Sequence, residues 1–179
     1  MADATPNAPE TAEPTEPTLT MTAAQVVLHD AALTAPEIAA ADPERLLLVP
    51  MLEVAGEARY VLVRWPDWPH PALLSFAPPV ANDTLEASAA DLARARLGLT
   101  ATAPARLAEL RVPVRMGSPR LGLETTGWIR GVLQPVSGEP TPDVLVEGCD
   151  VLSLSEAEAA LTTEVERMVL RAAAATALR

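Results

Sequence analysis

FAPPVANDTLEASAADLARARLGL, residues 76–99, is the stretch that decides the fold of this chain. It reads as the end of an apolar strand, a rigid Pro-Pro turn, a helix and a glycine stop. Asp83 is the expected N-cap, and Glu86 three positions later closes a capping box. Leucine and alanine then recur at helical spacing, and Gly98 suits the left-handed position after a helix. A strand, a loop and a helix in this order place free N–H groups and a helix dipole where an anion can bind.

The same stretch resembles the Nudix box, the strand–loop–helix motif of the Nudix hydrolases. The family motif reads Gly-x5-Glu-x7-Arg-Glu-U-x-Glu-Glu-x-Gly-U, where U is a bulky aliphatic residue. Aligned on Gly98 and Leu99, the box spans Ala77–Leu99, with Ala77 at the first glycine and Asp83 at the first glutamate. The resemblance implies an α/β fold, an α/β/α sandwich with a mixed β-sheet. It also implies a ligand in which a nucleoside diphosphate is linked to another group.

The box is degenerate at its carboxylates. Asp91 and Leu92 fall on the Arg-Glu pair, and Ala95 and Arg96 fall on the two adjacent glutamates. In the family those glutamates hold Mg²⁺ against a diphosphate, and Mg²⁺ takes hard oxygen ligands in a near-octahedral shell. Slipping the register by one residue does not bring Asp91 into place, because it turns a side chain by about 100° around the helix. We therefore expect a retained scaffold, a lost metal site and no resident cofactor.

Length and charge limit the classes of function. The 179 residues suffice for one domain with a core and a tail. The formal net charge of −11 argues against a protein that binds the nucleic-acid backbone. Eight of the 24 acidic residues and none of the 13 basic ones precede Arg45, so the remainder is nearly balanced. The sequence shows no membrane-spanning run and no secretory signal. We expect a cytoplasmic protein without a membrane partner.

The chain divides into three segments on composition. Residues 1–20 are rich in proline, threonine, alanine and glutamate, and we expect a disordered acidic tail there. Residues 21–44 form an N-terminal extension. Residues 45–179 are the part that the resemblance implies to be a Nudix-like domain, and we expect it to open with a hairpin of two strands over 46–53 and 58–65. The hairpin ends in an arginine–aromatic pair and is followed by a loop and a strand into the box, which is also the Nudix layout.

After the box, the pattern continues in the Nudix order. Residues 105–116 read as an edge-type strand broken at Pro113, because proline donates no ladder hydrogen bond. Residues 125–136 form a long strand, with a bulge expected at Gly127 or Gly131. Ser153 and Glu156 form a second capping box. A terminal helix is expected from Thr163, with an apolar face and glutamates in its first turn.

Two functions remain open. In the first, the fold is a non-catalytic binding or regulatory module for a nucleotide-type small molecule. Its candidate ligand-binding side chains are Arg64, Trp68 and Arg96. Trp68 would stack on a base or merely cover the edge of the core. Arg96 would offset phosphate charge, or lie solvated on the helix surface.

In the second function, the protein is an active Nudix hydrolase that cleaves a nucleoside diphosphate derivative. The catalytic candidates are then Glu86, Glu124 and Glu139, which would have to assemble a relocated site for Mg²⁺ or Mn²⁺. A third interpretation, a structural subunit or homodimer partner, rests on the acidic tail and the alanine-rich terminal helix.

Overall fold

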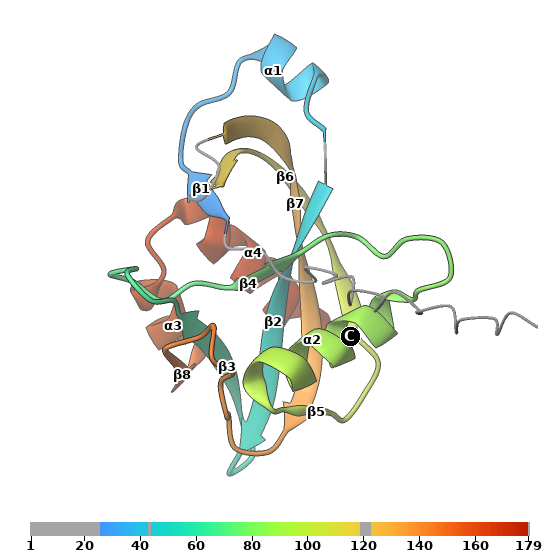
Figure 1. The fold of residues 1–179 in the computed structure, drawn as a ribbon, viewed down its shortest axis with the longest axis vertical. Helices are drawn as coiled ribbons and strands as arrows, with labels where there is room; N and C mark the ends of the chain where they lie inside the picture. Colours follow the sequence, from blue (N-terminus) through green and yellow to red (C-terminus); the bar gives the residue numbers. More distant parts are fainter. Residues whose placement is uncertain (1–25, 43, 119–122, 179) are drawn as a thin grey trace, which may run out of the picture.

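A computed structural model describes residues 26–42, 44–118 and 123–178 (Figure 1). The acidic tail expected over residues 1–20 lies outside these ranges. The elements are β1 (Val27–His29), α1 (Ala35–Ala39), β2 (Glu44–Val54), β3 (Glu57–Arg64), β4 (Leu74–Phe76), α2 (Leu85–Leu97), β5 (Thr100–Ala101), β6 (Arg106–Ser118), β7 (Leu123–Ser137), β8 (Gly148–Leu152), α3 (Leu154–Ala160), α4 (Glu164–Ala175) and the 3-10 turn Thr176–Leu178. None of the described helices is long and apolar enough to cross a membrane.

The strands form one mixed sheet. The order is β1-β6-β7-β2-β3-β8, with β4 paired to β2 and β5 paired to β7. β2 and β7 run parallel, whereas the other pairs are antiparallel. The predicted hairpin is β2–β3, and its turn passes through Ala55 and Gly56, both at positive φ. Helices cover both faces of the sheet, so the predicted α/β/α sandwich is confirmed (Figure 1).

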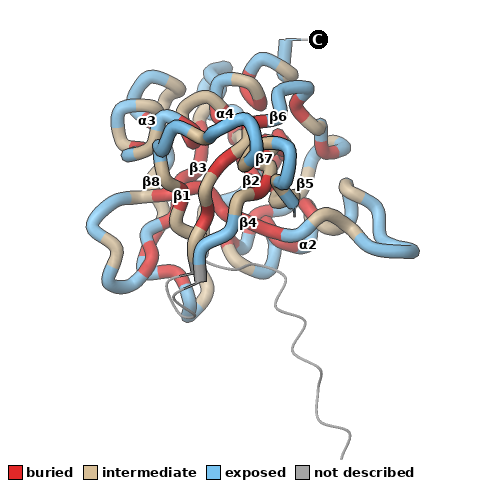
Figure 2. The backbone as a smooth tube through the Cα atoms, turned by 90° about the horizontal axis from the view of Figure 1, so that it is seen from above, coloured by how far each residue is buried: buried red, intermediate tan, exposed pale blue. Residues whose placement is uncertain are grey.

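Each face of the sheet has its own hydrophobic core. Along β2, Leu46 and Leu48 point to the core under α2, while Leu47 and Val49 point to the core under α4. This is the period of two that a strand imposes on its side chains. Figure 2 shows the buried residues gathered along the strands, with exposed residues on the outer sides of the helices. The continuous apolar run of β2 is therefore explained by burial on both faces.

The helix of the box begins one residue later than predicted. Thr84, not Asp83, is the N-cap of α2, and its hydroxyl oxygen accepts the backbone N–H of Ala87 at 3.1 Å. The predicted capping box between Asp83 and Glu86 is therefore wrong, because Asp83 lies outside the helix. The C-terminal prediction is confirmed: Gly98 adopts φ 66° and its N–H donates to carbonyls of the last turn.

The strand after the box is not broken at its proline. β6 runs without interruption from Arg106 to Ser118, between β1 and β7, so the predicted break is wrong. β1 pairs with residues 115–117, and no described strand covers the outer side of β6 at Pro113, where a strand tolerates a missing donor. The irregularity lies between Leu107 and Arg111 of β6, where the register shifts, rather than on β7.

The C-terminal helices begin where the capping signals predict. Ser153 accepts the N–H of Glu156, whose carboxylate accepts the N–H of Ser153, before α3. Thr163 caps α4 in the same way as Thr84 caps α2. α4 then crosses β7 so closely that a Cβ on Gly131 would lie 3.0 Å from both Val169 and Ala173. The first turn of α4 meets the loop that leads into β4, where the N–H of Leu73 donates to the carboxylate of Glu166 at 3.4 Å.

Candidate functional site

The box positions of α2 are used for packing and for one ion pair. Leu92 is 2% exposed and Ala93 is fully buried in the core under α2. Ala95 is exposed and offers no polar atom. Arg96 is half-buried and forms an ion pair with Asp143. The face of the helix that would carry the carboxylates of the box therefore holds no oxygen ligand for a cation.

The loop after β7 is fastened to the C-terminal end of α2. The N–H of Thr141 donates to the carbonyl of Leu97 at 2.7 Å, and the N–H of Asp143 donates to the carbonyl of Arg96 at 3.0 Å. These bonds satisfy carbonyls that a helix end leaves without a partner. Arg96 therefore ties a loop to a helix, and its guanidinium already neutralises a carboxylate.

The structure does not bring the three candidate catalytic glutamates together. Glu86 lies exposed in the first turn of α2, while Glu139 lies in the loop held at the opposite end of that helix. Glu124 is at the other end of β7 and pairs with His29 at 3.6 Å. Within residues 26–42, 44–118 and 123–178, no group of three or more His, Cys, Asp or Glu side chains is placed to hold a metal ion.

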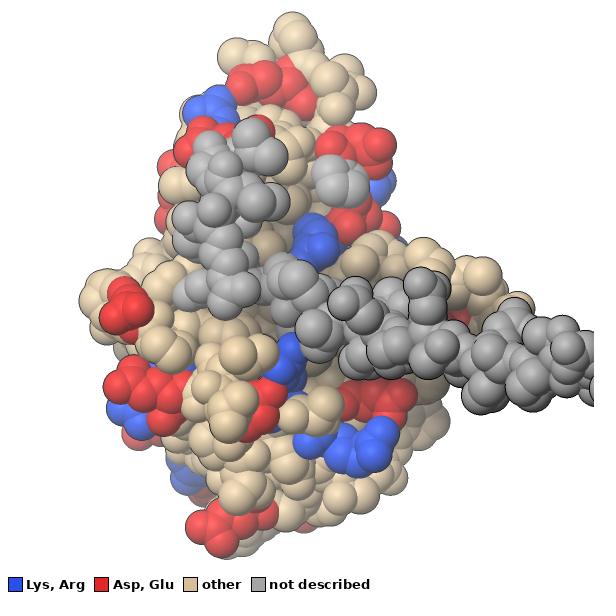
Figure 3. Space-filling model, in the orientation of Figure 1, with Lys and Arg blue, Asp and Glu red and all other residues tan. Residues whose placement is uncertain are grey.

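Of the three predicted ligand-binding residues, Arg96 lies on α2, whereas Arg64 ends β3 and Trp68 lies in the loop that follows. Arg64 is half exposed, and its Nε lies 3.7 Å from a carboxylate oxygen of Asp150 on the edge strand β8. Trp65 is buried in the core under α2, whereas Trp68 is half-buried in the following loop. On the face seen in Figure 3, the described basic side chains lie next to acidic ones. Of the two tryptophans, only Trp68 is accessible to a ligand.

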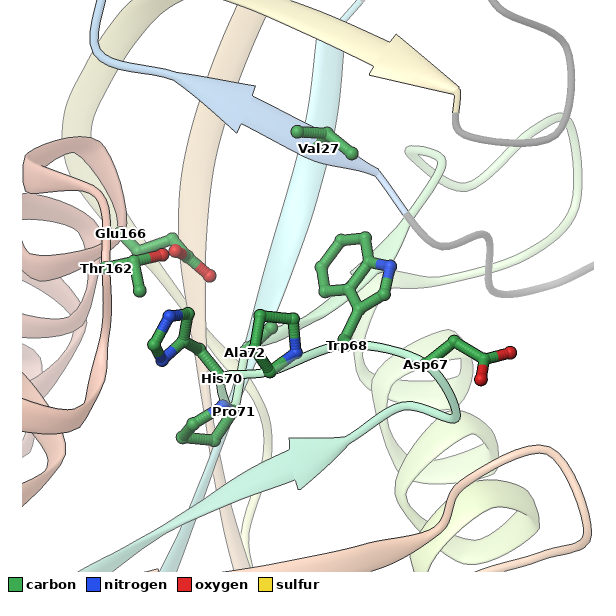
Figure 4. Close-up of a pocket in the computed structure, with 9 residues that line it drawn as sticks. Val27, Asp67, Trp68, His70, Pro71, Ala72, Thr162 and Glu166 are labelled. Atoms are coloured by element: carbon green, nitrogen blue, oxygen red, sulfur yellow. The ribbon is translucent and has the colours of Figure 1, made fainter.

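Trp68 lines a pocket of about 340 Å³, here called the loop–helix pocket. The pocket lies between the loop over residues 66–72, the strand β1 and the start of α4 (Figure 4). Its size is at the lower end of small-molecule pockets, which suits a single ring system. Its walls include Val27, Trp68, His70, Ala72, Thr162 and Glu166.

Glu166 is the buried polar group of the loop–helix pocket. It is 7% exposed, and burial raises the pKa of its carboxyl group, although hydrogen bonds from Thr163 and Leu73 oppose this. One carboxylate oxygen accepts the hydroxyl of Thr163 at 2.9 Å, and the other accepts the N–H of Leu73 at 3.4 Å. Asp30 lies nearby and accepts the N–H groups of the first two residues of α4. Two carboxylates thus stand at the start of one helix.

Comparisons with known proteins identify the fold that this arrangement of strands and helices represents. No protein-family model matches the sequence, and no curated protein matches it either. Solved structures do match. The Ap4A hydrolase of C. elegans in a binary complex aligns with a TM-score of 0.54 at 13% identity, over 75% of this chain and 97% of that one. The chain has the Nudix fold.

Two further Nudix structures agree with this assignment. The NUDIX domain of NrtR from Shewanella oneidensis, complexed with ADP ribose, aligns with a TM-score of 0.53 at 13% identity, over 82% of this chain and 100% of that domain. The Nudix hydrolase RenU from M. smegmatis aligns with a TM-score of 0.51 at 19% identity, over 75% and 86%. At these identities the likeness concerns the Nudix fold, and the chemistry has to be argued from the side chains.

Sequence reasoning singled out Trp68 but missed Glu166. The signal for Glu166 was present in the sequence: it lies four residues before Leu170 and seven before Ala173, on the buried face of α4. A glutamate on the apolar face of a helix is seldom fully buried without a partner. It also stands three residues after Thr163, as in a capping box. No local signal predicted that Val27 lines the pocket, because this depends on how β1 packs against the loop over residues 66–72.

Proposed function

We propose that this chain binds a nucleoside-diphosphate-linked ligand without hydrolysing it. The proposal rests on the residues that α2 carries at the positions of the box glutamates. Leu92 is part of the core, and Arg96 is engaged with Asp143. Metal-assisted hydrolysis of a diphosphate needs several oxygen ligands around one Mg²⁺ ion. The residues at these positions do not fit such an ion.

The ligand class rests on the fold and on the groups near the end of β3. A neighbour in fold, the NUDIX domain of NrtR, is complexed with ADP ribose. In this chain Arg64 is half exposed and loosely paired, so its guanidinium can turn toward a phosphate. Trp68 offers an aromatic face four residues further on. In the proposed complex, Arg64 contacts a phosphate of the ligand and Trp68 contacts its base.

The alternative is an active hydrolase with a relocated carboxylate site. It would require Glu86, Glu124 and Glu139 to meet around one ion after a large rearrangement, because they stand at separate ends of α2 and β7. The 3.6 Å contact between Glu124 and His29 would also have to open. We therefore favour binding, and a hydrolysis assay decides between the two functions.

The test is a hydrolysis and binding panel. The protein is incubated with nucleoside triphosphates, nucleotide sugars, ADP-ribose and dinucleoside polyphosphates in the presence of Mg²⁺ or Mn²⁺, with a chelator control, and the products are read by mass. We expect no chelator-sensitive turnover and measurable binding by calorimetry. Turnover that disappears in Glu124→Gln or Glu139→Gln, but persists in the exposed control Glu53→Gln, would overturn the proposal and locate the relocated site.

Cellular setting and assembly are proposed on composition alone. A net charge of −11 supports a protein without a nucleic-acid partner, and we propose a cytoplasmic location. Homodimer formation stays a prediction, which light scattering of the full chain would check.

A further inference from the structure

The loop–helix pocket contains one buried acceptor that its own fold does not use fully. Each oxygen of a carboxylate accepts up to two hydrogen bonds. In Glu166, one oxygen accepts the hydroxyl of Thr163 and the other accepts the N–H of Leu73 over a long 3.4 Å. The backbone N–H of Thr163 also lies near the carboxylate and helps to lower its pKa. Glu166 also lines the pocket, and Figure 4 shows its carboxylate directed toward the side of the pocket where the His70 ring lies. The hydrogen bonds from the Thr163 hydroxyl and the Leu73 N–H occupy one position on each oxygen, so the side of the carboxylate that lines the pocket keeps acceptor capacity for a ligand.

The walls of the pocket favour a flat, largely apolar ring. Val27 and Ala72 contribute aliphatic surface. Pro69 and Pro71 stiffen the loop that carries Trp68. The Trp68 indole lies beside Val27 at the end away from Glu166, while Asp67 points away from the interior (Figure 4). An aromatic side chain of this kind stacks on any base, so it supplies affinity without choosing among bases. The choice among bases falls to Glu166.

We infer that the loop–helix pocket binds a planar heteroaromatic base that presents a ring N–H and an amino N–H side by side, as guanine does. The two oxygens of a carboxylate accept such a pair of parallel donors. Hypoxanthine offers the ring N–H alone. Adenine offers an amino group beside an unprotonated ring nitrogen, whose lone pair would face a carboxylate oxygen. This inference rests on the proposed function, because it names the base of the nucleotide-type ligand.

The experiment uses GMP, IMP and AMP as probes, with the full chain and a chelator present. None of these monophosphates contains a diphosphate bond, so the result does not depend on hydrolysis. We expect GMP to bind at least about tenfold more tightly than IMP or AMP, since a hydrogen bond to a charged group contributes at least this factor. Calorimetry gives the affinities, and the part of the tryptophan fluorescence change that is lost in Trp68→Leu reports contact with Trp68 rather than with the other two tryptophans.

Two variants make the test specific to Glu166. Glu166→Gln keeps the size of the side chain but replaces one acceptor by a donor, so the preference for GMP is expected to disappear. Glu164→Gln is the matched control, because it removes the same charge two residues away, on a side chain that is 51% exposed and paired with Arg167 and Arg171. It should keep the preference. Trp68→Leu should weaken the binding of all three nucleotides by a similar factor. Thermal melts confirm that each variant is folded.

The outcomes separate this inference from the proposed function. Equal affinities for the three nucleotides would overturn the choice of base and leave a nucleotide-binding protein. A GMP preference that survives Glu166→Gln would overturn the role of Glu166. Absence of binding to all three, on folded protein, would overturn the base pocket, while the diphosphate panel judges the proposed function independently. Hydrolysis in that panel together with a GMP preference here would overturn only the non-catalytic proposal.

Discussion

The close packing of α4 against Gly131 of β7 gives a stability prediction with a definite sign. A Cβ added to Gly131 on β7 would lie 3.0 Å from Val169 Cγ1, Ala173 Cβ and the carbonyl oxygen of Val169. All three atoms belong to a buried and well-packed part of α4, so the helix has to move as a unit. Overpacking of this kind costs about 1–3 kcal/mol.

A second effect opposes the first. Glycine within a strand is less favourable than alanine by about 0.5–1 kcal/mol. Because the overpacking term is larger, Gly131→Ala should lower the free energy of unfolding by about 1–2 kcal/mol. For a chain of this length that corresponds to a fall in Tm of about 2–8 °C. Thermal unfolding followed by circular dichroism, together with urea titration, measures both quantities.

Gly148→Ala is the matched control for Gly131→Ala. The added Cβ would lie even closer to its neighbour, 2.7 Å from Nη2 of Arg64. That neighbour is the tip of a half-exposed, flexible side chain, which can swing away at little cost. We therefore expect Gly148→Ala to be neutral or slightly stabilising. If Gly131→Ala leaves the Tm unchanged, or if both variants fall equally, the close packing of α4 on β7 is refuted.

Three further predictions concern the helices. Thr84→Ala should cost about 1 kcal/mol of stability, whereas Asp83→Ala should be close to neutral in the same urea titration; a larger loss for Asp83→Ala would restore the predicted cap. Leu92→Glu restores a box glutamate but buries an unpaired carboxylate, and should abolish cooperative unfolding; a well-folded variant would contradict the packing of α2. Burial raises the pKa of Glu166, so its contribution to stability is fully present below its unfolded pKa and is lost as the pH rises through the folded value. The Tm of Glu166→Gln relative to wild type should therefore increase from about pH 4 to about pH 8, and a constant difference in melts across this range would contradict it.

Local signals predicted the elements whose ends are set by a few neighbouring residues. The β2–β3 hairpin, the glycine stop at Gly98 and the capping box at Ser153 were all predicted from short patterns. The N-cap of α2 was harder, because Asp83 and Thr84 are adjacent residues of the capping type. Their order is decided by the path of the preceding loop, in which Ala81 adopts a positive φ.

These local patterns could not predict which distant segments of the chain come together in the fold. The continuity of β6 through Pro113 depends on which part of the strand β1 covers. The loop–helix pocket depends on three segments that are far apart in the sequence, represented by Val27, Trp68 and Glu166. Trp68 was predicted because an aromatic between prolines is visible by itself. That Trp68 shares a pocket with the buried carboxylate of Glu166 on α4 could not be predicted from the sequence, because it depends on the folded arrangement of the segments.

At position 92 of the box helix, packing against the sheet and metal binding require different side chains. A buried leucine contributes about 1.5–3 kcal/mol by leaving water, and Leu92 anchors α2 on the sheet in this way. A carboxylate at the same place is tolerated only if a cation or a hydrogen-bond network neutralises it. At the neighbouring site, Arg96 and Asp143 have already neutralised each other. The packing of α2 at these two positions therefore supports the proposal that the box helix holds no metal ion. In the proposed binding function, ligand recognition falls to polar groups that packing leaves with acceptor capacity, and in the described part of the chain Glu166 in the loop–helix pocket is such a group.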